Sequence, residues 1–328
     1  MTMSASAELP PLPSELRSLA LRPRDHGYED VRHTYVYRGA PALVLRPRTA
    51  EEVAAALAYA RPLEVPLAVR SGGHGISGRS TNDGGIVIDL GALRGIEVAD
   101  PARRLVTVGA GARWGEVAAE LAPHGWAISS GDTGDVGVGG LATAGGIGWL
   151  VRAHGLTIDR VRAADLVLAD GTLVRADAEH HPDLFWGVRG AGANLAVATS
   201  FDIEASEVGG LVLAVTAYDV RDPRRFLPRW AAAVEAAPRS VTSFLTLVPH
   251  GPSGTPVGQA MTVYDGDDPV AARQALAPLL DAGPQLGGDN YLLRYPDLVR
   301  TSGQAHAANQ PLSVARSGLL DHLTEPVA

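Results

Sequence analysis

The chain has 328 residues, 46% of them hydrophobic, which is enough for one large domain or two ordinary domains with a substantial core. Its net charge of −8, without any basic cluster, argues against nucleic acid or an anionic membrane surface as a partner. It has no Cys, and all 28 basic residues are Arg, which excludes thiolate metal sites, cysteinyl-flavin links, and Schiff-base or P-loop lysines.

The first predicted elements form a βαβ unit. Residues 1–35 are expected to be a polar, proline-containing leader, and a clearer pattern begins at Ala42. Two short apolar runs predict strands, and Thr49 with Glu52 three positions later is a capping-box signature for a helix between them. The strands are 43–45 and 67–69, and the helix is 53–60.

The next segments predict further strands and one helix. An apolar run over 86–90 predicts a third strand, and the runs 96–98 and 105–108 predict a strand pair. Helical spacing of apolar residues predicts a helix over 114–121. Asp170-Gly171, between the apolar runs 167–169 and 173–174, predicts a hairpin with a two-residue type I′ turn.

The spacing of apolar residues along the sequence changes after residue 207. Strands are expected at 211–218 and 243–248, and helices at 223–237 and 269–280, with little periodicity from 283 onwards. The sequence therefore predicts two domains, one over 36–207 and an α+β region over 208–328.

Glycine is concentrated in one part of the chain, because 20 of its 38 glycines lie between Gly72 and Gly148. Glycine allows positive φ and close approach of the backbone to a ligand, so that several N–H groups can converge on an anion. The loop Arg70–Gly78 formally contains GxGxxG, but it leads through a turn into another strand rather than into a helix. A Rossmann site and a Walker loop are therefore both rejected.

Three motifs carry a resemblance to a known family. They are the loop Arg70–Gly78 with 83–90, the glycine-rich run 131–140 with 145–150, and the scattered set His154-Gly155-Leu156, Asp159, 169–171 and 183–186. Their order and spacing resemble the vanillyl-alcohol-oxidase-type flavoproteins, also called the PCMH-type FAD-binding family, and especially the berberine-bridge-enzyme-like branch. The resemblance covers about 36–203. It implies an α+β fold with a PCMH-type FAD-binding domain of two α/β subdomains, followed by an incomplete antiparallel-sheet substrate domain.

The resemblance also implies a cofactor and its contacts. In this family the loop matching Arg70–Gly78 wraps the FAD pyrophosphate, and the histidine matched by His74 bonds to the flavin 8α-methyl group. Thr133 stands where some members have a second, cysteinyl tether, so a single link is expected. The implied FAD contacts are Arg70, Ser71, Gly72, Gly73, His74, Gly75, Ile76, Ser77, Thr133, Val136, Gly137, Gly139, Gly140, Thr143, Gly146 and Val197.

Some family features are absent from the sequence. Ala144, Ala191, Ala193 and Ala196 stand at usual glycine positions, and Leu195 replaces an aromatic residue. A later family motif with paired tyrosines and an asparagine, often accompanied by a catalytic base, has no match. The chain is therefore expected to be either a fragment or a naturally short relative, and the catalytic residues are unknown.

The expected function is that of an FAD-linked oxidase or dehydrogenase. A base would take a proton from a small-molecule alcohol or amine while a hydride passes to flavin N5, and O2 would then reoxidise the flavin. Two alternatives stay open: an FAD-binding remnant that lacks the base, and an NADPH-dependent reductase on the same fold. No apolar run reaches the roughly 20 residues that span a bilayer, and no signal peptide is recognised, so a cytoplasmic protein is expected. The sequence does not determine the oligomeric state.

Overall fold

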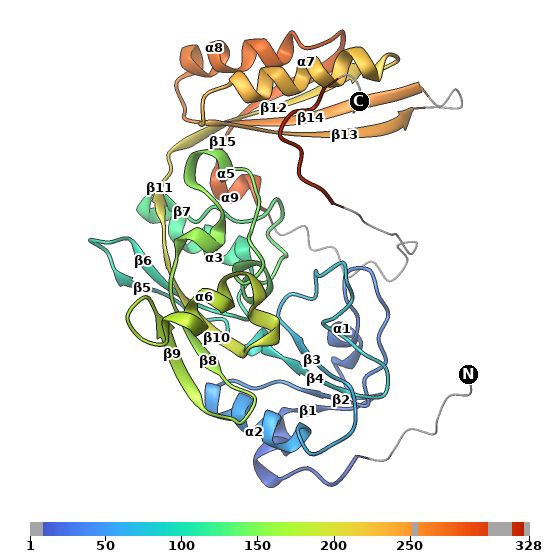
Figure 1. Ribbon diagram of the computed structural model, residues 1–328, viewed down its shortest axis with the longest axis vertical. Helices are drawn as coiled ribbons and strands as arrows, with labels where there is room; N and C mark the ends of the chain where they lie inside the picture. The colour runs from blue at the N-terminus through green and yellow to red at the C-terminus, as the bar shows by residue number, and fades with distance from the viewer. Residues whose placement is uncertain (1–8, 251–254, 301–316, 325–328) are drawn as a thin grey trace.

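The computed structural model describes residues 9–250, 255–300 and 317–324, which form three main sheets and the helices that pack on them (Figure 1). The first and second sheets lie next to each other and belong to the N-terminal two thirds of the chain. The third sheet lies at one end of the molecule, where two helices cover its outer face.

The first sheet is built around a buried parallel core. Its strand order is β1-β2-β4-β3, in which β2 and β3 both run parallel to β4. All residues of β2 and β4 are buried, which explains why these strands read as continuous apolar runs. The strands are β1 (Ala20–Leu21), β2 (Leu43–Leu45), β3 (Leu67–Arg70) and β4 (Ile86–Asp89).

The predicted βαβ unit is confirmed, and its helix is α2 (Ala50–Ala60). The hydroxyl of Thr49 accepts a hydrogen bond from the Glu52 N–H at 3.2 Å, as the capping signature requires. The Glu52 carboxylate accepts instead from the N–H of Arg48, at 2.6 Å. The second hydrogen bond of the capping box is therefore displaced by one residue, because Glu52 accepts from the N–H of Arg48 and not from that of Thr49.

The expectation of a polar leader is wrong for residues 9–35. The 3₁₀ helix η1 (Ser14–Leu19) buries Leu16 and Leu19, and β1 pairs with β2. A short helix, α1 (Tyr28–Arg32), buries Tyr28 against the opposite face of the sheet. Prolines and charged residues make this segment polar on average, whereas a few well-spaced apolar side chains join it to the core.

The second sheet is antiparallel, with the strand order β5-β6-β10-β8-β9. Helix α3 (Trp114–Leu121) buries the four residues from which it was predicted. The predicted hairpin joins β8 and β9, but five residues connect them, and Gly171 donates to the Leu168 carbonyl with φ at 90°. The hairpin is therefore confirmed, but the prediction of a two-residue type I′ turn is wrong. The strands are β5 (Ile96–Asp100), β6 (Leu105–Gly109), β8 (Val161–Val167), β9 (Leu173–Asp177) and β10 (Val197–Glu204).

Short elements connect these strands. A two-stranded ribbon pairs β7 (Trp126–Ala127) with β11 (Ser206–Glu207). The α-helices are α4 (Val138–Ala142), α5 (Val151–His154) and α6 (Pro182–Ala191). The 3₁₀ helices are η2 (Leu90–Ala92), η3 (Ala122–His124), η4 (Thr157–Arg160) and η5 (Gly192–Asn194).

The third sheet is antiparallel, with the order β13-β14-β12-β15, and α7 and α8 cover its outer face (Figure 1). Two predicted strands and both predicted helices are confirmed here as β12, β13, α7 and α8, whereas β14 and β15 were not predicted. The elements are β12 (Gly210–Asp219), α7 (Pro223–Ala236), β13 (Val241–His250), β14 (Thr255–Asp265), α8 (Pro269–Leu280), β15 (Gln285–Arg294) and α9 (Tyr295–Leu298).

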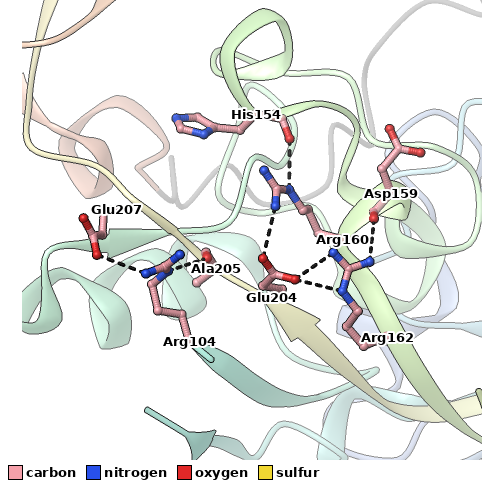
Figure 2. A network of polar contacts seen from close by, with 8 residues as sticks. All are labelled: Arg104, His154, Asp159, Arg160, Arg162, Glu204, Ala205 and Glu207. Atoms are coloured by element: carbon pink, nitrogen blue, oxygen red, sulfur yellow. Dashed lines mark hydrogen bonds and ion pairs between the residues drawn. The ribbon is translucent and has the colours of Figure 1, made fainter. Parts of the chain in front are cut away.

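Arginine-centred contacts fix the point where the chain leaves the second sheet for the third (Figure 2). Glu204, at the end of β10, accepts hydrogen bonds from Arg160 and Arg162. Arg104 pairs with Glu207 of β11 at 3.0 Å and donates to the Ala205 carbonyl. These contacts fix the direction in which the chain leaves β10, the central strand of the second sheet. Within the described ranges, the helices are too short or too polar to cross a membrane.

Candidate functional site

The two glycine-rich loops of the sequence meet back to back in the structure. A Cβ atom added to Gly72 would lie 2.2 Å from the Gly137 nitrogen, and one added to Gly137 would lie 2.2 Å from the Gly72 nitrogen. Arg113 joins the loops, because its guanidinium donates to the Gly72 carbonyl at 2.8 Å and to the Asp135 carbonyl at 2.5 Å. Only glycine at both positions permits this approach.

Beside the loops lies a cavity of about 970 Å³, a volume at the upper end of the range for ligand sites. It lies between the first and second sheets and is lined by β3, the loop after β3, α4, and the start of β10. Thirteen of the sixteen predicted FAD contacts line it, namely Ser71, Gly72, Gly73, His74, Gly75, Ser77, Val136, Gly137, Gly139, Gly140, Thr143, Gly146 and Val197.

The other three predicted contacts do not line the cavity. Arg70 is only 2% exposed and donates to the His33 carbonyl at 2.6 Å, so its guanidinium lies behind the loop. Ile76 points outward with 51% of its surface exposed, and Thr133 is half-buried in its own loop. The departures Ala144, Leu195 and Ala196 do line the cavity.

The wall of the cavity fits an anionic ligand. None of the six backbone N–H groups from Gly72 to Ser77 donates a hydrogen bond to another described residue. A Cβ atom added to Gly75 or Gly140 would enter open space with no atom closer than 4.0 Å. Both residues line the cavity, so no side chain covers the backbone at these two positions. Unsatisfied donors on a bare backbone are what a diphosphate requires.

His74 is half-buried at the cavity and lies against an aromatic ring. Its imidazole stacks on Tyr35 with the ring centroids 5.2 Å apart and 14° between the planes, and the Tyr35 N–H donates to the Gly73 carbonyl at 2.7 Å. Burial, and then the charge of Arg113, hold the pKa of His74 below its ordinary value of 6.5. The imidazole is therefore neutral near pH 7, the form that has a free lone pair for nucleophilic attack.

Two residues that position the site were missed by sequence reasoning. Arg113 lies outside both glycine-rich loops, and Tyr35 falls in the segment expected to be a leader. Neither has a local sequence signal, because each acts on a loop at least 22 residues away in the chain. Their roles become visible only once the structure shows which loop each of them contacts.

Comparisons with known proteins agree with this geometry. Residues 41–177, which include both glycine-rich loops, match the family described as FAD binding domain. The chain is 35% identical to (R)-6-hydroxynicotine oxidase of Paenarthrobacter nicotinovorans over 204 residues, 62% of this chain and 44% of that protein. It is 40% identical to xylooligosaccharide oxidase of Thermothelomyces thermophilus over 164 residues, 49% of this chain and 33% of that protein. The chain thus spans less than half the length of these curated relatives.

A solved structure extends the likeness beyond the family match. The crystal structure of 6-hydroxy-D-nicotine oxidase from Arthrobacter nicotinovorans superposes with a TM-score of 0.78 and 28% identity, and the match covers 85% of this chain and 62% of that one. The similarity therefore includes the third sheet as well as the two that surround the cavity. Residues 41–177 thus match the FAD-binding domain family, and the chain as a whole is similar in fold to 6-hydroxy-D-nicotine oxidase.

Proposed function

We propose that the protein is an FAD-dependent oxidase of a small-molecule alcohol or amine and that it binds FAD in the 970 Å³ cavity through a covalent bond to His74. The observation that carries the proposal is the position of a neutral, half-buried imidazole at one part of a cavity whose wall offers free backbone N–H donors. The names of the two curated relatives, hydroxynicotine oxidase and xylooligosaccharide oxidase, support an oxidase of small molecules.

The roles of the protein residues follow from the geometry. The N–H groups from Gly72 to Ser77 bind the diphosphate, and Arg113 keeps the two loops together behind it. Bound flavin supplies a two-electron acceptor for a hydride from substrate, and O2 takes up these electrons afterwards. The paired sheets on both sides of the cavity exclude water from the buried part of the cofactor.

His74 acts as the nucleophile that attaches the cofactor. His74 would hold the cofactor through a bond from its neutral ring nitrogen to the flavin 8α-carbon, with one proton lost from the imidazole and one from the methyl group. O2 would take up the two electrons and two protons that this attachment releases. Attachment prevents loss of the cofactor by dissociation.

Acid precipitation of the purified protein tests the proposal. We expect yellow protein whose flavin stays in the pellet, and we expect His74→Ala to remain folded while its flavin appears in the supernatant or is absent. His26→Ala, which changes an exposed histidine, is the control and should retain pelleted flavin. Acid-stable flavin in His74→Ala would show that the link lies elsewhere.

The same preparation distinguishes the two alternatives. Turnover of any alcohol or amine, with hydrogen peroxide as product, excludes a non-catalytic FAD-binding remnant. FAD released from the wild type by acid, together with oxidation of NADPH, would favour a reductase on the same fold.

A further inference from the structure

The cavity has an unusual distribution of charge. Among the described residues that line it, Arg79 is the only one with a full formal charge. The rest of the wall consists of glycine, small hydroxyl residues, two asparagines, apolar side chains and the neutral His74. A ligand with a diphosphate would therefore meet one cation and no carboxylate.

The neighbouring arginines are already engaged behind the loop. Arg70 donates to the His33 carbonyl, and Arg113 donates to the carbonyls of Gly72 and Asp135. The buried Asp89 further neutralises both guanidinium groups, since its charge raises the pKa of each against the effect of burial. Arg79 is exposed, and its guanidinium forms neither a hydrogen bond nor an ion pair with any other described residue.

Local turns keep Arg79 next to the free N–H donors. The Gly78 N–H donates to the Gly75 carbonyl at 3.1 Å, and the Thr81 N–H donates to the Gly78 carbonyl at 3.2 Å. These consecutive turns fold the segment back along the cavity instead of leading it away. The next residue, Ser80, also lines the cavity, and its buried hydroxyl has no hydrogen-bond partner among the described residues.

We propose that Arg79 is the charged recognition residue for the diphosphate of the bound flavin dinucleotide. The inference rests on the proposed function, which makes FAD the occupant of the cavity. It adds a source of selectivity, because the N–H donors and a long flexible guanidinium together favour a phosphorylated flavin over riboflavin. A single exposed cation also makes the affinity for FAD depend on ionic strength.

The test compares FAD with riboflavin in a protein that binds flavin reversibly. In the His74→Ala background, where no bond forms, the dissociation constants of both flavins are measured by quenching of flavin fluorescence. We expect Arg79→Gln to weaken FAD binding by about tenfold, the size of one charge-assisted hydrogen bond, and to change riboflavin binding less than about twofold. Salt should weaken FAD binding less in the Arg79→Gln protein. Arg273→Gln, at an exposed arginine of α8, is the control and should change neither constant.

Each outcome bears on one hypothesis. An unchanged FAD constant in Arg79→Gln, or an equal loss for FAD and riboflavin, overturns the assignment of Arg79 while FAD binding itself stands. If His74→Ala does not fold, the rate of FAD uptake by flavin-free protein that retains His74 is compared with and without Arg79→Gln, and equal rates overturn the assignment. Failure of the wild type to bind any flavin overturns the proposed function.

Discussion

The face of the His74 ring and its edge have separate roles. Tyr35 packs on the ring face, with 5.2 Å between the centroids, whereas a bond from a ring nitrogen to a carbon atom lies in the ring plane. Stacking and covalent attachment are therefore compatible. Tyr35 is also anchored to the loop by the hydrogen bond from its N–H to the Gly73 carbonyl. It restricts the imidazole to one orientation before the cofactor binds.

We expect Tyr35→Ala to lower the fraction of flavin that survives acid by severalfold while total flavin stays near the wild-type amount. Tyr35→Phe should restore attachment, because phenylalanine retains the ring and the backbone N–H. Flavin absorbance in pellet and supernatant measures both fractions. An alanine variant that attaches flavin as completely and as fast as the wild type would refute a positioning role.

The pH dependence of attachment follows from the lowered pKa of His74. Only the neutral imidazole is nucleophilic, and it predominates above the folded-state pKa, which lies below the ordinary value of 6.5. When FAD is added to flavin-free protein, we expect a constant attachment rate between about pH 7 and 8 and a decrease only below about pH 6.5. A rate that rises steadily through pH 8 would indicate a nucleophile with a higher pKa.

Val136 is a candidate for controlling access of oxygen. It is half-buried and lines the cavity, and its carbonyl accepts from the Trp114 N–H at 3.1 Å, which fixes its backbone. In the berberine-bridge-like proteins that the chain resembles, the matching position borders the space where oxygen meets the flavin. Because leucine is one methylene larger, we expect Val136→Leu to slow reoxidation of chemically reduced protein in air by severalfold without releasing FAD. Equal reoxidation rates in the two proteins would exclude this role.

At the scale of the element, β15 is notable for its exposure. Nine of its ten residues are exposed, and among the described residues no strand pairs with its outer edge. Its sequence contains Gly287, Gly288, Asp289 and Asn290, which are poor strand formers, and for this reason the strand was not predicted. Pairing with β12 over most of its length provides the order that local preference does not.

This edge predicts self-association of the chain. Leu286, Tyr291 and Leu292 are 60%, 47% and 69% exposed, and apolar side chains on an open edge favour strand addition. We expect concentration-dependent association of the 328-residue chain in sedimentation experiments, and a reduction by Leu292→Lys. Val270→Lys, at a 63% exposed apolar residue of α8, should not reduce it. A monodisperse monomer across the concentration range would contradict this expectation.

At the scale of the whole molecule, a few polar contacts join the third sheet to the flavin-binding part. Arg152 of α5 donates to the carbonyls of Ala237, Pro238 and Val241, and His154 lies 2.8 Å from the Asp265 carboxylate of β14. The buried Tyr295 hydroxyl lies 2.9 Å from the Ser130 hydroxyl. Ser130 directly precedes the second glycine-rich loop, so the Tyr295 contact joins the helix after β15 to the start of that loop.

Removal of Arg152 should therefore weaken the coupling between the two parts. Arg152→Ala leaves three carbonyls without their donor, and we expect a loss of about 1–3 kcal/mol and a broader or split thermal transition in calorimetry. Arg224→Ala, at an exposed arginine of α7, serves as the matched control and should melt like the wild type. A sharp transition with unchanged midpoint in Arg152→Ala would show that apolar packing alone couples the parts.

The sequence by itself determined the features that depend on neighbouring residues. The buried runs of β2 and β4, the four buried residues of α3, the cap of α2 and the glycine-rich loops all have local patterns, and the order of the motifs indicated the family that the chain resembles. The tertiary structure decided which distant segments meet. It placed Tyr35 on His74, Arg113 between the loops, β1 beside β2, and β15 beside β12. Such contacts gain their stability from burial and hydrogen bonds between segments far apart in the chain. The residues next to each segment therefore do not indicate which distant segment it contacts.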